Sequence, residues 1–334
     1  MDLLDQQLQA NLRGDFEKGW ELAQILERER PNCNRCAFNR GWHYLQQGKF
    51  QEGFELLDCG RWERVFGSPP LRTDKPIWNM EDDLTGNHLL MRAEGGLGDE
   101  IINVRFAKDF ADKGAKVTVG ASDSLMSVFS RVEGVSSVVL RGSEEYVYHD
   151  YWVPAMSAPR LSGNTYETLS GKPYLTNSDR MCLSNDFTLG ICWAGNPEFE
   201  HEQHRKFPPE KLIDIHKKFP EIQVCSFQKD TRLLDKVGEV LDLGKHLKDW
   251  EITLMLLSDM DLVISSCTSV AHASSALGIE TWVIVPILPY YIWAFPGNKS
   301  PWYDSVTLYR QTEFGNWDET FEKLYADLEE RIKK

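Results

Sequence analysis

The chain has 334 residues, a net charge of −14 and 42% hydrophobic residues. This length is ample for a buried core and favours two domains, whereas the acidic balance argues against nonspecific binding of nucleic acid. No apolar run approaches the ~20 residues that a membrane helix needs. Residues 1–16 lack the positive start and apolar core of a secretory signal. We therefore expect a cytoplasmic globular protein.

Cysteine usage argues against a disulfide framework, because the seven cysteines are odd in number and widely scattered. Cys33 and Cys36 form one C-x-x-C motif, with His43 and Cys59 nearby. A structural zinc site usually has a second such pair. Burial of small side chains between two helices is therefore the favoured interpretation, and no metal site is expected.

Residues 1–62 are predicted to be helical. Residues 37–60 have the layout of a tetratricopeptide unit, with two helices flanking a short turn at Gly48 and Lys49. Residues 11–31 resemble the preceding half-unit. Because ~3 such units are normally needed to bury their faces, this helical segment, residues 1–66, should pack on the next domain. It would act either as a structural cap or as an acceptor-binding arm.

Strands and helices alternate from His88 onward, after a proline-rich linker at residues 67–86 whose acidic run, 81–83, is expected to be a solvated loop. Expected strands lie at residues 88–94, 116–120, 136–140 and 151–153, with helices at 100–113 and 122–132. A polar stretch, 176–186, precedes a second series with strands at 188–193, 222–227, 261–265 and 281–285, and a last helix at 317–334. This alternation predicts two parallel, doubly wound sheets, hence Rossmann-like domains at 67–180 and 181–334, with ligands in the cleft between them.

The first strand leads into the sequence EGGLGDE, residues 94–100. Gly96 and Gly98 supply part of a dinucleotide fingerprint, but Ile101 stands where the third glycine belongs, which disfavours an NAD-dependent enzyme. A P-loop is also missing, because no Gly-Lys-Ser/Thr occurs here. The loop would place Asp99 at the mouth of the cleft, either as a general base or as a helix cap.

Residues 261–278, DLVISSCTSVAHASSALG, combine a buried strand, a polar turn and a helix of small residues that stops at Gly278. Thr268 or Ser269 is the expected N-cap. Free N–H groups and small side chains at such a helix start let a phosphate approach closely. The segment therefore predicts a phosphate-bearing ligand in the C-terminal half.

Cations follow the strand at residues 188–193, on a loop that turns sharply at Asn196. Arg205 and Lys206 on this loop suit a diphosphate leaving group, whose charge grows during transfer. The pair His201 and His204 lacks the partners that a metal would need. An aromatic run, residues 290–295, follows the last predicted strand and packs either on a sugar or base, or over the domain core.

Several motifs occur together and in a fixed order: GKFQEGFELLDCGRW, HLLMRAEGGLGDEIINVRFA, DYWVPAMSAPRL, ICWAGNP, SFQKD, DLVISSCTSVAHASSALG and SPWYDSVTLYRQ. With them the chain resembles GT-B glycosyltransferases of the heptosyltransferase-like group, in the form fused behind tetratricopeptide repeats, and more distantly the O-GlcNAc transferases. The resemblance implies an α/β GT-B fold, two Rossmann-like domains facing a cleft. It also implies inverting, metal-independent transfer from a UDP- or ADP-linked sugar to a glycan, lipid-linked glycan or protein, without a further cofactor.

The same resemblance implies roles for individual residues. Asp99 would be the general base, and Arg205, or alternatively Lys206, would bind the donor phosphate. The remaining residues expected to bind the nucleotide sugar are Gly96, Leu97, Gly98, Asn196, Gln228, Thr268, Ser269, Val270 and His272. The group usually has aspartate where this chain has Cys267, and a thiol offers neither a fixed charge nor a strong acceptor. A non-catalytic, glycosyltransferase-like binding or scaffold protein is therefore the alternative.

Overall fold

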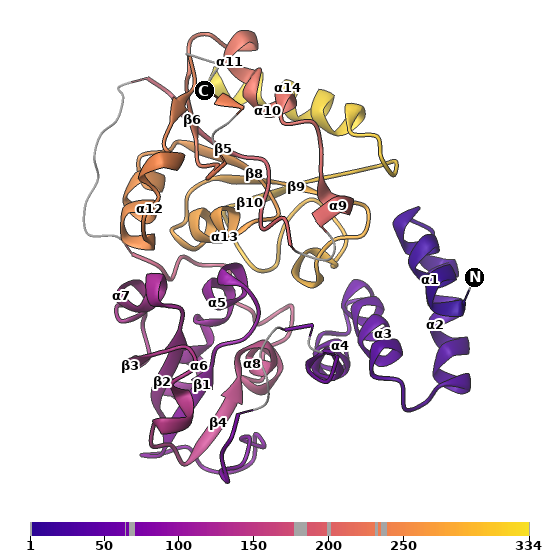
Figure 1. The fold of residues 1–334 in the computed structure, drawn as a ribbon, viewed down its shortest axis with the longest axis vertical. Coiled ribbons are helices and arrows are strands. Elements are labelled where there is room, and N and C mark those ends of the chain that lie inside the picture. The colour runs from indigo at the N-terminus through magenta and orange to yellow at the C-terminus, as the bar shows by residue number, and fades with distance from the viewer. Residues whose placement is uncertain are drawn as a thin grey trace.

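The computed structural model describes residues 2–63, 65–66, 71–176, 186–198, 202–230, 233–234 and 239–333 (Figure 1). His201, most of the polar stretch at 176–186 and the start of the linker at 67–86 lie outside them. Two parallel sheets lie one above the other in this view, and the N-terminal helices lie to one side of both. Within these ranges no helix is both long and apolar enough to cross a bilayer.

The N-terminal segment consists of helical hairpins. Its helices are α1 Leu3–Leu12, α2 Phe16–Glu29, α3 Asn34–Gln46 and α4 Phe50–Leu57. Gly14 and Gly48 adopt φ of 78° and 81° in the tight turns of the two hairpins, a conformation that favours glycine. The Cys33 thiol accepts a hydrogen bond from the Cys36 N–H at the start of α3 (3.3 Å). The predicted helices are confirmed, whereas the tetratricopeptide assignment stays a prediction.

This helical segment packs on the rest of the molecule, as its small size predicted. The Trp42 indole donates to the Pro289 carbonyl (2.9 Å). Phe50 and Phe54 lie against Trp302, with ring centroids 6.1 and 6.0 Å apart. The short helix η1 Asp58–Arg61 continues α4 toward the first sheet. The segment therefore shares one hydrophobic core with both sheets.

The first sheet has the strand order β3-β2-β1-β4, and all of its strands are parallel. Its strands are β1 His88–Arg92, β2 Lys116–Ala121, β3 Val135–Leu140 and β4 Tyr151–Pro154. These bounds confirm the predicted strands to within two residues at each end. β1 is buried because it lies between β2 and β4 and carries the apolar run of residues 89–91.

The helix predicted at residues 100–113 is wrong in both its start and its continuity. It begins three residues earlier, as α5 Leu97–Asn103, and a second helix, α6 Phe106–Asp112, follows. The Arg105 side chain donates to the Ile102 carbonyl (3.0 Å), an acceptor that a continuous helix would use for its own backbone. The helix predicted at 122–132 is likewise shorter, with α7 at Met126–Phe129.

The second sheet has the order β10-β9-β8-β5-β6-β7 and is also parallel. Its strands are β5 Thr188–Cys192, β6 Gln223–Ser226, β7 Leu241–Asp242, β8 Leu262–Ser266, β9 Thr281–Val285 and β10 Val306–Arg310. β7 and β10 were not predicted, since both are edge strands with weak apolar patterns. Further helices are α8 Ala158–Leu161, α9 Glu202–Arg205, α10 Glu210–Ile213, α11 Ile215–Lys218, α12 Trp250–Leu257, α13 Ser269–Ala276 and α14 Asp318–Ile332.

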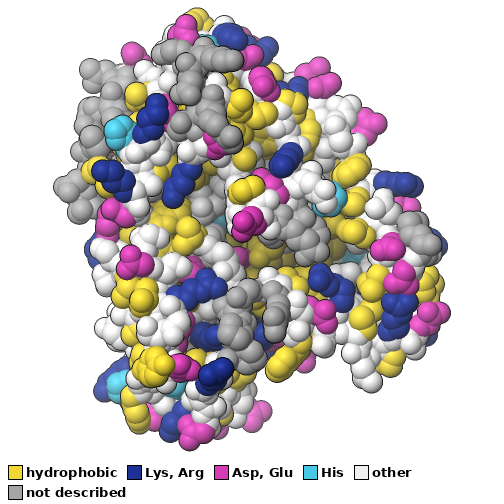
Figure 2. All heavy atoms as spheres, viewed as in Figure 1, with side chains coloured by type: hydrophobic (Ala, Val, Ile, Leu, Met, Phe, Trp, Pro, Cys, Tyr) yellow, Lys and Arg dark blue, Asp and Glu magenta, His cyan; other side chains and the backbone are white. Residues whose placement is uncertain are grey.

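Surface charge is mixed rather than gathered by sign. On the face shown in Figure 2, Lys and Arg side chains are interspersed with Asp and Glu. Neither sign of charge gathers into a patch among the coloured side chains of this face, so an anion-binding site on it must depend on a local arrangement of cations.

Candidate functional site

Two helix starts meet between the sheets. α5 follows β1 and α13 follows β8, so both helices begin at carboxyl ends of parallel strands, and they pack against each other (Figure 1). Gly98 permits this approach, because a Cβ there would lie 3.0 Å from His272 Cδ2 and 3.7 Å from Ser269 Cα. The structure therefore brings three predicted site residues together: Gly98, Ser269 and His272.

Asp99 lies in the first turn of α5 rather than in a flexible loop, which corrects the predicted placement. Its carboxylate accepts hydrogen bonds from the Gly96 N–H (2.8 Å) and the Tyr290 hydroxyl (2.9 Å). The bond to Gly96 is half of a capping box, so Asp99 does cap its helix. Burial raises the pKa of Asp99 to about 6, against the opposing effect of these two hydrogen bonds. A carboxyl group with this pKa is ionised at neutral pH and still basic enough for proton transfer.

Gly95, which was not among the predicted site residues, holds this turn in place. Its N–H donates to the Phe66 carbonyl (2.8 Å), and its carbonyl accepts from Arg141 (2.8 Å). Its φ is +72°, and an added Cβ would overlap the Asp99 carboxylate. The left-handed conformation and the crowding both require glycine here.

We expect Gly95→Ala to lower the free energy of unfolding by about 1–3 kcal/mol, because alanine is strained at this φ and displaces Asp99. Urea denaturation measures this loss. Gly96→Ala is the matched control, since a Cβ there would meet only an Asp99 oxygen at 3.8 Å. Equal stability of the two variants would contradict the assignment of the turn to Gly95.

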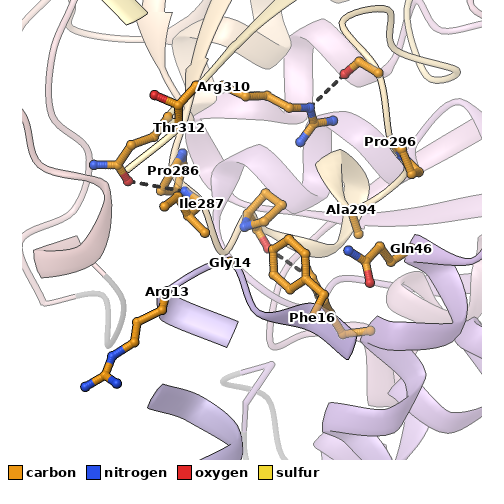
Figure 3. Close-up of a pocket in the computed structure, with 14 residues that line it drawn as sticks. Arg13, Gly14, Phe16, Gln46, Pro286, Ile287, Ala294, Pro296, Arg310 and Thr312 are labelled. Atoms are coloured by element: carbon orange, nitrogen blue, oxygen red, sulfur yellow. Dashed lines mark hydrogen bonds between the residues drawn. The ribbon is translucent and has the colours of Figure 1, made fainter. Parts of the chain in front are cut away.

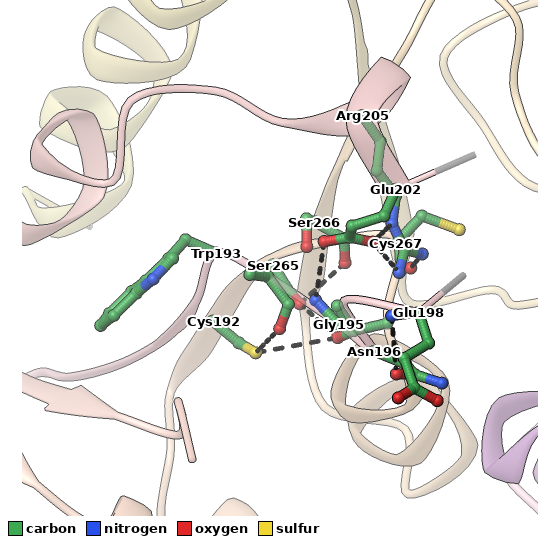
Figure 4. A network of polar contacts seen from close by, with 12 residues as sticks. Cys192, Trp193, Gly195, Asn196, Glu198, Glu202, Arg205, Ser265, Ser266 and Cys267 are labelled. Carbon is green, nitrogen blue, oxygen red and sulfur yellow. Dashed lines mark hydrogen bonds and ion pairs between the residues drawn. The ribbon is translucent and has the colours of Figure 1, made fainter. Parts of the chain in front are cut away.

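Arg205 lies beside the start of α13 (Figure 4). It forms an ion pair with Glu202, and its guanidinium donates to the Cys267 carbonyl. Cys267 immediately precedes Thr268, the N-cap residue of α13. The predicted cation and the predicted phosphate-binding helix therefore meet, although they are 62 residues apart in the sequence.

The N-terminus of α13 carries no side-chain cap. The Thr268 hydroxyl lies 2.9 Å from the Ser265 hydroxyl instead of bonding to the first turn. Ser269 and Val270 then begin the helix, and Gly278 ends it with φ of +82°. An uncapped helix start beside an arginine suits a phosphate group.

Three residues predicted to bind the nucleotide sugar form hydrogen bonds with protein groups outside the start of α13. Gln228 is buried, and its amide oxygen accepts from the N–H groups of Trp193 (3.2 Å) and Ala194 (3.0 Å), so it ties β6 to the turn after β5. Asn196 is exposed and accepts from the Glu198 N–H within its own loop. Lys206 is also exposed, and its carbonyl accepts from the Trp317 indole. Gln228 is thus a positioning residue for that turn.

His272 cannot act as a cation at neutral pH. Burial, reinforced by Arg105 and Arg205, lowers its pKa to about 3. The ring stacks on Trp293 with centroids 5.4 Å apart, and Nδ1 lies 3.3 Å from the Tyr303 hydroxyl. The neutral ring shapes the contact between α13 and α5, and its phosphate-binding role stays a prediction.

The aromatic run at residues 290–295 folds over the core, as one of its two interpretations predicted. Trp293 is 1% exposed and donates to the Cys267 thiol (2.8 Å). Its neighbour Tyr290 is the residue that donates to Asp99. Sequence reasoning missed both contacts, and the only signal for them was an aromatic run directly after a strand.

Arg92, at the carboxyl end of β1, was also missed. It is buried, and neither its Nε nor its Nη1 atom has a hydrogen-bond partner within the described ranges. Nearby, Arg61 pairs with Glu94 (2.7 Å) and Arg141 with Glu100 (2.7 Å). The sequence signal for Arg92 was an arginine at the end of the apolar strand HLLMR.

The described residues contain no group of three His, Cys, Asp or Glu side chains placed to hold a metal.

The fold is similar to that of solved glycosyltransferases. A family 9 glycosyl transferase from Veillonella parvula matches 77% of this chain and 92% of its own, with a TM-score of 0.54 and 9% identity. The E. coli ADP-heptose LPS heptosyltransferase II matches 74% of this chain and 98% of its own, with a TM-score of 0.51 and 12% identity. The E. coli heptosyltransferase WaaC, solved with ADP, matches 73% of this chain and 99% of its own, with a TM-score of 0.50 and 12% identity.

No family model and no curated protein matches the sequence. At these identities the likeness concerns the fold, and it confirms the predicted fold class. The chain has an α/β GT-B fold, the architecture of these glycosyltransferases, with a helical segment added at its N-terminus.

Proposed function

We propose that this protein is an inverting, metal-independent glycosyltransferase that moves a sugar from a nucleotide-diphosphate donor to a hydroxyl group. The observation that carries the proposal is the meeting of α5 and α13, where a carboxyl group, an uncapped helix start and an arginine converge. The donor is UDP- or ADP-linked, and the E. coli heptosyltransferase of this fold that was solved with ADP supports the second of these.

In this proposal Asp99 removes the proton of the acceptor hydroxyl while that oxygen bonds to the anomeric carbon. The bond from that carbon to the diphosphate breaks, and negative charge accumulates on the departing phosphate. The α13 N-terminus and Arg205 stabilise this charge. Residues 67–180 would hold the acceptor, residues 181–334 the donor, and the tetratricopeptide-like residues 1–66 would support both.

Arg205 tests the donor half of the proposal. We expect Arg205→Gln to weaken ADP or UDP binding about 10- to 100-fold, because a hydrogen bond to a charged group contributes about 1.5–3 kcal/mol. Isothermal titration calorimetry measures the affinity. Lys206→Gln is the control, since its side chain is exposed. If Lys206→Gln has the larger effect, the phosphate lies on the other cation, and Arg205 is a structural residue.

The second candidate is a non-catalytic nucleotide-binding protein of the same fold. It is favoured by the internal hydrogen bonds of the site, where Tyr290 donates to Asp99 and Trp293 to Cys267. An assay with a panel of UDP- and ADP-linked sugars separates the two functions. Nucleotide binding without transfer or hydrolysis would favour the second candidate.

A further inference from the structure

A pocket lies between the N-terminal helices and the second sheet, away from the meeting point of α5 and α13 (Figure 3). Its volume is about 440 Å³. The turn between α1 and α2 forms one wall, and the residues that follow β9 and β10 form the other. Parallel sheets place their ligands at such carboxyl ends.

The charges around this pocket are of one sign. Arg13 and Arg310 line it, and no aspartate or glutamate does, although the chain carries a net charge of −14. Arg310 donates to the carbonyls of Gly297 (2.7 Å) and Phe295 (2.7 Å), which hold its guanidinium without neutralising it. In the described part of the chain neither arginine forms an ion pair with an acidic side chain.

The remaining walls combine ring surfaces with uncharged polar groups. Phe16, Trp42 and Pro289 contribute rings, and Gln46 and Thr312 contribute an amide and a hydroxyl. Flat ring surfaces pack against the C–H faces of a sugar, and amides and hydroxyls bond to its hydroxyl groups. Arginine prefers phosphate and carboxylate groups.

The pocket also shares a wall with the candidate reaction site. Pro289 lines the pocket and its carbonyl accepts from Trp42, whereas the next residue, Tyr290, donates to Asp99. Further along the same segment, Trp293 contacts Cys267 while Ala294 lines the pocket. A ligand in the pocket would therefore lie against the segment that holds the general base.

We propose that this pocket binds an anionic saccharide, a sugar bearing a phosphate or a carboxylate group, as a distal unit of the acceptor. The assignment to the acceptor rests on the proposed glycosyl transfer. Anion binding itself rests on the pocket alone. Arg310 holds the anionic group, and the rings of Phe16 and Trp42 hold the sugar, whereas the Arg13 side chain points outward at the rim (Figure 3).

The test is ligand binding to the full chain, measured by saturation-transfer NMR and calorimetry. The probes are glucose 6-phosphate, glucuronate, glucose and inorganic phosphate. We expect one of the two anionic sugars to bind at least tenfold more tightly than glucose and than inorganic phosphate, and the comparison between them identifies the anionic group. Arg310→Gln should abolish this preference, and Thr312→Glu should do the same without removing an arginine. Arg28→Gln, on the exposed face of α2, removes the same charge and should leave binding intact.

Three results would overturn the proposal: glucose binding as tightly as the anionic sugars, inorganic phosphate binding as tightly as the anionic sugars, or Arg28→Gln weakening binding as much as Arg310→Gln. ADP and UDP serve as an independent readout, because they are proposed to bind at α13 and should be insensitive to Arg310→Gln. If no nucleotide binds but the anionic sugar does, the proposed transfer fails and the pocket stands. If nucleotides bind and support transfer but no anionic sugar binds, only the pocket assignment fails.

Discussion

Asp99→Asn is expected to lower the rate of sugar transfer by about 10²–10⁴-fold, the usual contribution of a general base. Asparagine has the same size, and its amide oxygen can still accept from the Gly96 N–H, so α5 keeps its cap. Nucleotide affinity should therefore change little. Transfer kinetics and nucleotide titration of the same variant measure the two effects. Full turnover by Asp99→Asn would exclude the proposed base.

The pH dependence provides a second measure of this role. Because the base must be ionised, the transfer rate of the unaltered protein should rise with pH through about 6, the pKa of Asp99, and then level off. Tyr290→Phe removes a hydrogen bond that lowers this pKa. The variant should keep its activity at high pH, with the rise displaced upward. An unchanged profile would show that another group titrates.

Stability separates a loss of catalysis from a loss of structure. The folded-state pKa of Asp99 is raised from 3.8 to about 6, so folding favours the protonated carboxyl group. The stabilisation is therefore present at low pH and is lost as pH rises between these values. Above pH 6 the unaltered protein must bury an ionised carboxylate, which costs stability. Asp99→Asn removes this cost, so the variant should be at least as stable as the unaltered protein there.

Arg61→Met is expected to lower the free energy of unfolding by about 3–5 kcal/mol, because it leaves the Glu94 carboxylate buried and unpaired. Arg61 and Glu94 are 2.7 Å apart, with side chains 9% and 0% exposed. The pair joins the end of the helical segment to the carboxyl end of β1. Urea denaturation measures the loss, and combining Arg61→Met with Glu94→Gln should recover part of it.

The control is a surface pair that joins two other elements. Arg131 and Glu251 are 2.6 Å apart, but each side chain is 35% exposed. Arg131→Met should therefore cost no more than about 1 kcal/mol. If Arg61→Met costs no more than this control, the Arg61–Glu94 pair does not anchor the helical segment, and its other contacts do.

Much of the fold was predictable because its signals are local. The apolar run of β9 and the glycine after α13 were placed correctly, since period, small residues and a helix stop are read within a few neighbours. β10 was missed because the apolar pattern of its residues is weak, and its pairing with β9 forms only in the folded sheet. The break at Arg105 was missed because its cause is a side chain turned back on the helix.

The same distinction holds for the candidate site. Local sequence patterns were enough to identify its parts: an acidic residue at the first helix start, a small-residue helix start in the second half, and a cationic loop between them. What these parts contact depends on how the chain packs in three dimensions. Tyr290 reaches Asp99 across 191 residues, and Arg205 reaches Cys267 across 62. Burial also makes His272 neutral and raises the pKa of Asp99. Local patterns depend on neighbours in the chain, whereas desolvation and long-range hydrogen bonds depend on packing, and packing exists only once the two sheets and the helical segment have come together.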